Sequence, residues 1–378
     1  MKYMEDFSDQ QLFFMRRAIE VGEKGKISAP PNPWVGCVIT KNNKIIGEGY
    51  HRAQGEPHAE RNAIHSATSS LKGAHVYVTL EPCAHYGHTP PCVDLLVKSK
   101  VAAVNVAVID PDERVAGSGI AKLRKAGIVV HVGVGRKEAE DSLRSYLYQR
   151  EHKQPWVVIK TAASIDGQVS DQDGCSQWIT CSKAREDVGK LRAFSQAVIA
   201  GADTIISDNP YLTARYPDGS LYPRQPLRVV LDSKGRVPLD SRIFHGPPES
   251  LYVTTEACPL VHLESIKNLG VSTLVVKRTP SGVDLSEVYS HLAKRNILQI
   301  LVEGGSTLHT SFLNSGLVHS LVLYHGNKIL GNQRKPIFKD LGLRLNSSKS
   351  FYIHKTEIIG NTLKTSWYAS DLYPPNET

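Results

Sequence analysis

A turn-rich segment separates two cysteines, Cys83 and Cys92, in the stretch Glu81-Pro82-Cys83-Ala84-His85-Tyr86-Gly87-His88-Thr89-Pro90-Pro91-Cys92. Upstream, His58-Ala59-Glu60 lies where the sequence pattern predicts the start of a helix. One imidazole and two thiolates bind zinc and leave a fourth coordination position for water. The sequence therefore predicts a zinc site formed by His58, Cys83 and Cys92.

Glu60 is the candidate proton shuttle of this site. Zinc lowers the pKa of its bound water toward 7, and a carboxylate that is not a ligand can move the water's proton to the ring nitrogen and the leaving ammonia. Cys92 is predicted just inside a helix, where the dipole favours a thiolate. The alternative is a surface histidine, a capping glutamate and two core thiols, but the Pro-Cys pair and the helix-start cysteine favour zinc.

The first 150 residues alternate between helical and strand-like segments, which predicts a layered α/β domain. A capping box at Ser8–Gln11 opens the first helix. A later helix runs from about His58 to Ser69, and another is capped by Thr89–Pro91 and runs to Lys98. The remaining expected elements are strands at Val35–Thr40 and Ile45–Tyr50 joined by a turn at Asn42–Asn43, strands at His75–Leu80, Ala103–Val108 and Ile128–Val132, and helices at Ile120–Ala126 and Lys137–Arg150.

A polar segment around His152–Pro155 separates this domain from a second α/β pattern. We therefore predict domains at 1–150 and 151–378. Strand-like runs in the second domain are Trp156–Thr161, Ala197–Ala200, Leu227–Asp232, Ser250–Thr254, Ser272–Val276 and Ile297–Val302.

Glu303-Gly304-Gly305-Ser306-Thr307 follows the last of these strands and precedes a helical segment. A strand, a glycine-rich turn and a helix N-terminus can bind phosphate, because backbone N–H groups and the helix dipole favour anions there. The turn residues alone are more typical of a tight turn. The chain has no Gly-x-Gly-x-x-Gly, so an ordinary Rossmann site is not expected.

Whole-chain composition narrows the class of protein further. No apolar run approaches the ~18 residues that a membrane span needs. The acidic N-terminus lacks an apolar signal-peptide core, which predicts a cytoplasmic protein whose six cysteines are thiols or ligands. Residues 1–150 hold 20 Lys and Arg against 16 Asp and Glu, and the remainder holds 25 against 21. This evenly distributed excess of basic residues favours phosphorylated small molecules over nucleic acid as binding partners.

Several motifs resemble one family, the bifunctional deaminase/reductase of riboflavin biosynthesis. The N-terminal matches are Pro31-Asn32-Pro33-Trp34-Val35-Gly36-Cys37-Val38, Gly55–Glu60 and the long Glu81–Cys92 segment. A common zinc-deaminase signature has two residues between its cysteines, whereas the eight residues here are typical of this family. The C-terminal matches are Lys160–Gly167, Ser176–Thr180, Gly201–Arg215 and Val302–Gly305.

The chain departs from the family pattern at two positions. His88 stands where the family usually has Arg or Lys, so a contact to the substrate phosphate is in question there. Ala29 replaces a common Thr.

The resemblance implies a cytidine-deaminase-like three-layer domain followed by a dihydrofolate-reductase-like α/β domain. It implies hydrolytic deamination of 2,5-diamino-6-ribosylamino-4(3H)-pyrimidinone 5′-phosphate, then NADPH-dependent reduction of 5-amino-6-(5-phosphoribosylamino)uracil to the ribityl product. The residues that it assigns to NADPH are Ala163, Trp178, Thr204, Asp208, Ser233, Gly305, Ser306, Thr307, Leu308, His309, Thr310 and Ser311. Those that it assigns to the substrate are Ser176, Arg192, Leu212, Arg215 and Glu303.

Some roles stay open at the level of sequence. Lys160, Asp208 and Glu303 are equal candidates for proton delivery or charge balance, and Trp178 is either a cofactor contact or a core aromatic residue. The rival functions are a deaminase with a structural C-terminal domain, and a nucleic-acid-editing protein, which should show a basic stripe or stacking aromatics. We expect small-molecule partners, no nucleic acid, no membrane and a homo-oligomer.

Overall fold

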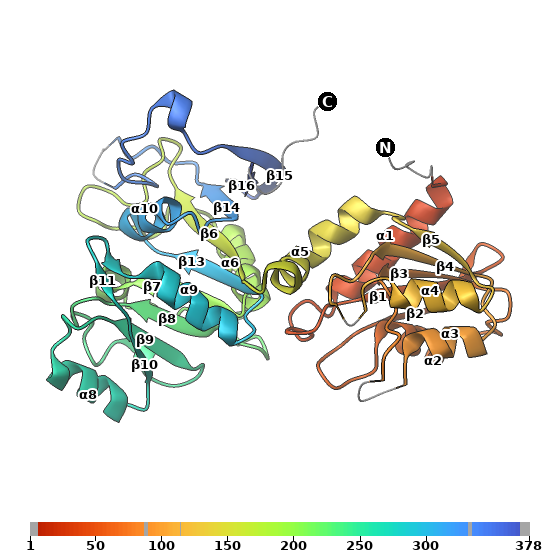
Figure 1. The fold of residues 1–378 in the computed structure, drawn as a ribbon. Coiled ribbons are helices and arrows are strands. Elements are labelled where there is room, and N and C mark those ends of the chain that lie inside the picture. The colour runs from red at the N-terminus through yellow and green to blue at the C-terminus, as the bar shows by residue number, and fades with distance from the viewer. Residues whose placement is uncertain (1–6, 87–89, 114, 332–334, 371–378) are drawn as a thin grey trace. The chain divides into compact units, whose positions relative to one another are not determined.

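The computed structural model describes residues 7–86, 90–113, 115–331 and 335–370, and the chain divides into two compact units, Met1–Lys153 and Gln154–Thr378 (Figure 1). Each unit contains a β-sheet with helices packed against it. Within the described residues, no helix is both long and apolar enough to cross a membrane.

The first unit has three layers around a five-stranded sheet of order β2-β1-β3-β4-β5. β1 pairs antiparallel with β2 and β3, whereas β3, β4 and β5 are parallel. Helices α1 and α5 pack on one face, and α2, α3 and α4 cover the other. The strands are β1 (Gly36–Lys41), β2 (Lys44–Tyr50), β3 (His75–Leu80), β4 (Ala103–Val108) and β5 (Val129–Val132), and the helices are α1 (Asp9–Glu23), α2 (Ala59–His65), α3 (Cys92–Lys98), α4 (Ser118–Lys125) and α5 (Arg136–His152).

Local sequence signals determine several ends of these elements. The capping box at Ser8 and Gln11 is present at the start of α1. Asn42 and Asn43 both have positive φ, 50° and 60°, which a tight hairpin turn between β1 and β2 requires. Helix α2 ends at His65, not at Ser69, because the Ser66 hydroxyl donates to the Glu48 carbonyl at 2.8 Å and turns the chain toward β2. The predicted Thr89 cap lies outside the described residues.

Close packing of α2 on the sheet places the zinc-site residues. A Cβ atom at Gly49 would lie 2.2 Å from the Ala63 backbone nitrogen, so only glycine allows α2 to lie this close to β2. The apolar core beneath includes Ala59 and Ala63 of α2 with Val76 and Val78 of β3. The first turn of α2 is therefore fixed against the end of β3.

The second unit has a nine-stranded sheet of order β10-β9-β8-β7-β13-β6-β14-β16-β15. The strands from β10 to β14 are parallel, and β16 and β15 complete the sheet as antiparallel strands. The strands are β6 (Trp156–Ala163), β7 (Ala197–Gly201), β8 (Leu227–Leu231), β9 (Ser250–Thr254), β10 (Ser272–Val275), β13 (Gln299–Glu303), β14 (Ser320–His325), β15 (Phe351–Ile359) and β16 (Thr362–Ala369), with a separate two-stranded ribbon of β11 (Arg278–Thr279) and β12 (Gly282–Val283).

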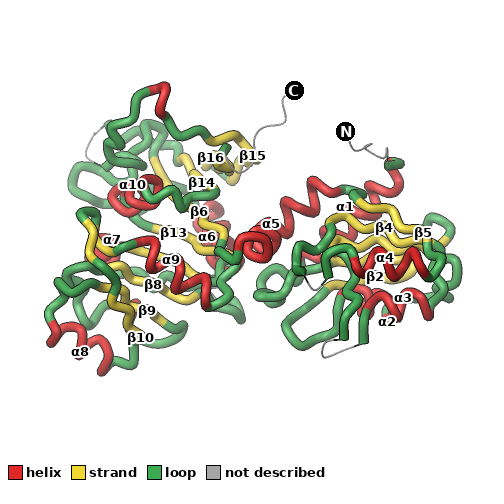
Figure 2. The backbone as a smooth tube through the Cα atoms, viewed as in Figure 1, coloured by secondary structure: helices red, strands yellow, loops and turns green. Residues whose placement is uncertain are grey.

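Helices cover both faces of this sheet. α9 and α10 pack on the apolar face that carries Ile159, Ile199 and Ile300. Alternation along the strands places Lys160 and Glu303 on the opposite face, where α6 packs near β13. The helices are α6 (Ser182–Phe194), α7 (Ala202–Asp208), α8 (Leu260–Asn268), α9 (Leu285–Lys294), α10 (Ser306–Asn314), η1 (Arg242–Phe244) and η2 (Leu345–Ser347). Figure 2 shows that long loops join several of these elements.

The sequence patterns do not predict β14, β15 or β16. β14 has a short apolar run, Leu321–Leu323, between Gly316 and Gly326, which the predictions did not include. β15 is an edge strand whose residues are partly or fully exposed. Such a strand lacks the apolar run that marks the buried parallel strands.

Candidate functional sites

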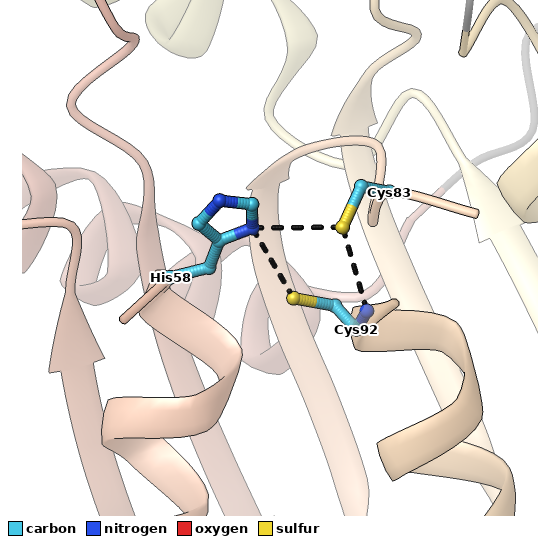
Figure 3. A group of neighbouring side chains, drawn as sticks. All are labelled: His58, Cys83 and Cys92. Carbon is cyan, nitrogen blue, oxygen red and sulfur yellow. Dashed lines mark hydrogen bonds between the residues drawn. The ribbon is translucent and has the colours of Figure 1, made fainter. Parts of the chain in front are cut away.

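Three predicted metal ligands meet at the edge of the first unit's sheet (Figure 3). His58 is the N-cap of α2, Cys83 follows the end of β3, and Cys92 is the first residue of α3. Each ligand therefore comes from a different element, and the loop between the cysteines allows the chain to return to the same point.

The donor set and its dimensions fit zinc. The His58 Nδ1 atom lies 3.5 Å from Cys83 Sγ and 3.4 Å from Cys92 Sγ, and all three ligand atoms lie within 4.8 Å of one another. With zinc bonds of about 2.0 Å to nitrogen and 2.3 Å to sulfur, a tetrahedral site needs roughly 3.5 Å between its ligand atoms. The three residues are thus already spaced for a tetrahedral ion that keeps one position open.

Neighbouring groups favour a thiolate at Cys83. Hydrogen bonds from the Cys92 side chain and from His58 lower the pKa of the Cys83 thiol, and the Cys92 backbone N–H also donates to Cys83 Sγ at 3.4 Å. The Cys83 side chain in turn raises the pKa of His58. Zinc binds cysteine as the thiolate and histidine as the neutral ring, so an ion bound here would displace the proton that His58 holds beside this thiolate.

Glu60 lies in the first turn of α2 and lines a cavity of about 450 Å³ beside the ligands. Its side chain is only 3 % exposed. Burial raises the pKa of its carboxyl most, and the negative charge of Cys83 raises it further. A carboxyl with a raised pKa can both accept and return a proton near neutral pH.

Other polar groups that line this cavity are held in fixed orientations. The His51 ring accepts from Asn32 Nδ2 at 3.1 Å and donates from Nδ1 to the Pro57 carbonyl at 3.2 Å, which assigns it a neutral tautomer. Burial lowers the pKa of His51 in agreement with that assignment. Asp110, at the end of β4, accepts from the Tyr146 hydroxyl at 3.3 Å.

Glu81 has a structural role that the motif did not reveal. Its carboxylate accepts from the backbone N–H groups of Gly117, Gly119 and Ile120 at 2.8–3.1 Å, at the start of α4. The carboxylate thus caps a helix that has no capping side chain of its own. Because Cys83 follows two residues later, this cap also fixes the position of one ligand.

The second unit holds a much larger cavity, about 1360 Å³, along the carboxyl ends of β6, β13, β7 and β8. Ligand sites in α/β sheets are commonly found at this edge. The predicted residues that line it are Lys160, Ser176, Trp178, Arg192, Thr204, Asp208, Leu212, Arg215, Ser233, Glu303, Gly305, Ser306, Thr307, Leu308 and Ser311.

Three residues predicted to contact the cofactor lie behind this surface. Ala163 is 1 % exposed and belongs to β6. His309 is completely buried in α10, its Nδ1 contacts the Ile337 carbonyl at 3.4 Å, and burial lowers the pKa of its ring to about 4. The Thr310 hydroxyl accepts from the Lys339 N–H at 2.8 Å. Within α10, the side chains at these two positions point away from the cavity that its first turn lines.

Glu303 lies between two cations at the floor of the cavity. Its carboxylate accepts two hydrogen bonds from Arg192, at 2.5 and 2.9 Å, and lies 3.6 Å from Lys160 Nζ. Burial alone would raise the pKa of Glu303, but Arg192 and Lys160 outweigh it and hold the pKa at about 2. Burial lowers the pKa of Lys160.

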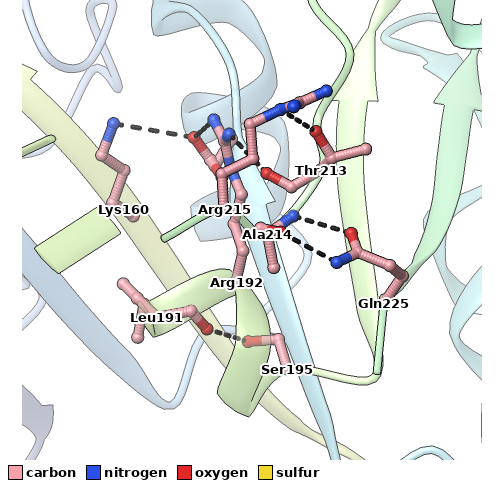
Figure 4. Close-up of polar contacts among 9 residues, drawn as sticks. Lys160, Leu191, Arg192, Ser195, Thr213, Ala214, Arg215 and Gln225 are labelled. Atoms are coloured by element: carbon pink, nitrogen blue, oxygen red, sulfur yellow. Dashed lines mark hydrogen bonds and ion pairs between the residues drawn. The ribbon is translucent and has the colours of Figure 1, made fainter. Parts of the chain in front are cut away.

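Arg192 and Arg215 differ in how much of each guanidinium group is available. Arg192 also donates to the Thr213 carbonyl at 3.1 Å, so its three nitrogens all have protein partners (Figure 4). Arg215 donates to Thr213 Oγ1 and the Gly219 carbonyl but is exposed, with no carboxylate partner among the described residues. Arg215 is therefore the guanidinium that is free to bind an anion at this wall.

The first turn of α10 presents backbone N–H groups to the cavity. Gly305 is its N-cap, no side chain caps the helix, and Gly304 to Leu308 line the cavity. This arrangement matches the predicted phosphate cradle. Trp178 is 57 % exposed and also lines the cavity, so it is not a core residue.

Sequence reasoning missed several residues of the first site. Asn32, His51 and Asp110 line the first cavity, and Asp110 follows a buried strand, a position that often carries functional side chains. Asn32 lay within a recognised motif without an assigned role. His88 lies outside the described residues.

Comparisons with protein families match each unit separately. Residues 8–108 match the cytidine and deoxycytidylate deaminase zinc-binding region, and residues 155–363 match the RibD C-terminal domain. The fold of both units thus agrees with the predicted cytidine-deaminase-like and reductase domains.

Full-length relatives are similar over nearly the whole chain. The riboflavin biosynthesis protein RibD of Chlamydia pneumoniae is 58% identical, over 97% of this chain and 98% of its own. RibD of Escherichia coli strain K12 is 39% identical, over 86% and 90%.

Solved structures agree as well. Acinetobacter baumannii RibD matches with a TM-score of 0.83 and 36% identity, over 95% of this chain and 99% of its own. A diaminohydroxyphosphoribosylaminopyrimidine deaminase/5-amino-6-(5-phosphoribosylamino)uracil reductase from Thermotoga maritima matches with a TM-score of 0.82 and 33% identity, over 95% and 99%.

Proposed function

The chain belongs to the RibD family of bifunctional deaminase/reductases in riboflavin biosynthesis, and we propose that it acts on the two substrates named for its Thermotoga maritima relative. It deaminates 2,5-diamino-6-ribosylamino-4(3H)-pyrimidinone 5′-phosphate and then reduces 5-amino-6-(5-phosphoribosylamino)uracil with NADPH. The observation that carries the proposal is the combination of a zinc-spaced His/Cys/Cys cluster beside Glu60 with a separate cavity around Lys160 and Glu303.

We assign the deaminase to residues 1–150 and the reductase to 151–378. Support comes from the division between Lys153 and Gln154 and from the two family matches on either side of it. Each cavity is lined by residues of one unit alone.

In the deamination step, we assign zinc binding to His58, Cys83 and Cys92. Zinc bound there would act as a Lewis acid that makes water a nucleophile near neutral pH. Glu60 would take one proton from the attacking water and give it to the ring nitrogen, and would then carry a second proton, from the hydroxyl so added to the ring carbon, to the leaving amine. Its burial raises the pKa of its carboxyl, which favours this exchange. Neutral His51 and Asp110 line the same cavity and offer polar atoms to orient the pyrimidine.

In the reduction step, we assign the first turn of α10 to the phosphates of NADPH, which would supply a hydride to C1′ of the opened sugar. The exposed Arg215 guanidinium binds the substrate phosphate, because it has donors free for a bidentate contact. Of the three candidates for proton delivery, we favour the Lys160–Glu303 pair at the cavity floor over Asp208, which is exposed and accepts from Ser207.

The decisive experiment follows metal content and both reactions on one preparation. We expect about one zinc per chain, ammonia release from the diamino substrate, and NADPH oxidation with the deaminated product. Ammonia release without NADPH oxidation, with zinc intact, would mean that the second unit is a structural module. NADH at the same concentration tests the choice of cofactor.

Cytoplasmic location, a homo-oligomeric state and the absence of a nucleic-acid partner stay predictions from the sequence. Light scattering measures the oligomeric state directly. Salt-sensitive binding of single-stranded RNA, with loss of affinity for the pyrimidine phosphate, would contradict the small-molecule assignment.

A further inference from the structure

One wall of the reductase cavity is a long loop between β6 and α6, residues 164–181, with no helix or extended strand. Ser170, Ser176 and Trp178 of this loop line the cavity. A loop of this length has few backbone hydrogen bonds of its own, so contacts with other segments must hold it in place.

The side chain of Asp166 joins this loop to a second loop that follows β14. Its Oδ1 accepts from the Leu330 N–H at 3.1 Å, and its Oδ2 accepts from the Gly331 N–H at 2.8 Å. The Ser164 hydroxyl donates to Oδ1 at 2.5 Å. These bonds, led by that from Ser164, lower the pKa of Asp166 to about 2, so the carboxylate stays ionised at neutral pH.

Two further hydrogen bonds extend this connection to the backbone of Trp178. The Ile165 N–H donates to the Lys328 carbonyl at 2.7 Å, and Lys328 Nζ donates to the Trp178 carbonyl at 2.8 Å. The Arg185 guanidinium lies 4.2 Å from the centre of the Trp178 ring. The segment 328–331 is therefore bound to Asp166 at one end and to Trp178 at the other.

Asp166 does not line the cavity itself, so any effect that it has on reduction acts through other residues. Trp178, by contrast, presents an exposed ring to the cavity. Lys328 holds the backbone of Trp178, and Arg185, which also lines the cavity, lies against the Trp178 ring. A ring fixed in this way is a preformed surface on which a planar ring can stack.

We propose that Asp166 is a positioning residue for the reductase reaction, which holds segment 328–331 and, through Lys328, the Trp178 wall against the cavity. This inference rests on the reductase function proposed above. If the connection is lost, the loop must be ordered when the cofactor binds, and that cost weakens binding.

Asp166→Asn is the sharpest test, because the amide keeps the size of the side chain but replaces one acceptor oxygen with a donor. We expect the KM for NADPH in reduction to rise about tenfold, because the variant loses one charge-assisted hydrogen bond. The Leu330 and Gly331 amides should exchange their hydrogens faster. Deamination should be unchanged, which reports on correct folding of the rest of the chain.

Asp173→Asn is the matched control. Asp173 lies in the same loop and is exposed, and in the part of the chain that the structure describes its carboxylate has no hydrogen-bond partner. The variant removes the same charge as Asp166→Asn but breaks no hydrogen bond. We therefore expect unchanged amide exchange and an unchanged KM. An equal rise of KM in both variants would mean that loop charge matters and not the connection.

Lys328→Met tests the link to Trp178 independently. We expect a higher KM for NADPH and stronger acrylamide quenching of Trp178 emission, measured against Trp178→Phe, while the Leu330 and Gly331 amides stay protected. This variant decides the matter if Asp166→Asn fails to fold. Normal reduction kinetics in Lys328→Met, or in a folded Asp166→Asn with faster exchange, would overturn the proposal. Absence of NADPH oxidation in the unmodified protein would instead contradict the proposed function.

Discussion

The deaminase and reductase cavities differ in how much of the chain builds them. The metal ligands and Glu60 come from residues 58–92, within elements that are neighbours in the sequence. The reductase cavity takes side chains from Lys160 to Lys339, at the ends of four parallel strands. Chemistry in the first site is concentrated in a few side chains, whereas in the second a buried charge cluster also holds the fold together.

Glu60→Gln is the change with the largest expected effect, and it tests whether the first site separates chemistry from folding. The amide fills the same buried space but cannot move a proton, so we expect deamination to fall by at least about 100-fold. Zinc content and reduction of the deaminated product should be unchanged, as measured by metal analysis and NADPH oxidation.

Glu56→Gln is the control for that variant. Glu56 lines the same cavity but is exposed, so its loss should change deamination little. Substantial deamination by Glu60→Gln would remove Glu60 from the mechanism.

Glu303→Gln tests the opposite property of the second site. The variant leaves Arg192 and Lys160 as partly buried cations without their carboxylate, so we expect the reductase unit to lose about 3–5 kcal/mol of unfolding free energy. Chemical denaturation followed by Trp fluorescence measures this.

Glu357→Gln serves for comparison, because Glu357 pairs with Lys355 and Lys364 near the edge of the sheet. We expect a loss below about 1 kcal/mol there. Equal stability losses in the two variants would show that the Glu303 cluster is no more structural than a surface pair.

Arg215→Ala tests whether the two sites bind substrate independently. Loss of the exposed guanidinium should raise the KM of the reduction substrate about tenfold while leaving its kcat and the deamination kinetics nearly unchanged. Arg295→Ala, which removes a surface pair with Glu249, is the control and should have no effect. Equal damage to both reactions would indicate a shared site.

The pH dependence of stability tests the same ion pair without a substitution. Because the folded pKa of Glu303 is about 2 and its ordinary value is 4.5, the ionised carboxylate stabilises the fold fully above pH 4.5. That contribution is lost as pH falls toward 2. Denaturation at several pH values should show that the unfolding free energy of the reductase unit falls with pH in the unmodified protein. The same decline should be absent in Glu303→Gln. Parallel curves for the two proteins would contradict the assignment.

Much of the first site was predictable from sequence, because its chemistry lies in short motifs. His58, Cys83 and Cys92 meet as expected, since a helix start, a strand end and a second helix start each place one ligand. Apart from β14, the parallel strands of both units were also predictable from their apolar runs. The strand, the two glycines and the helix start at α10 also lie where the sequence predicts them, and phosphate binding there stays a prediction.

The tertiary structure alone decided the rest, because it depends on pairing between distant segments. Arg192 was predicted to contact the substrate, and it lines the cavity, but no local pattern indicated its ion pair with Glu303, more than 100 residues later in the chain. His309 and Thr310 turn behind the cavity because successive residues of a helix point in different directions. The bonds of Asp166 to Leu330 and Gly331 likewise depend on β6 and β14 being neighbours in the sheet, an order that no local pattern encodes.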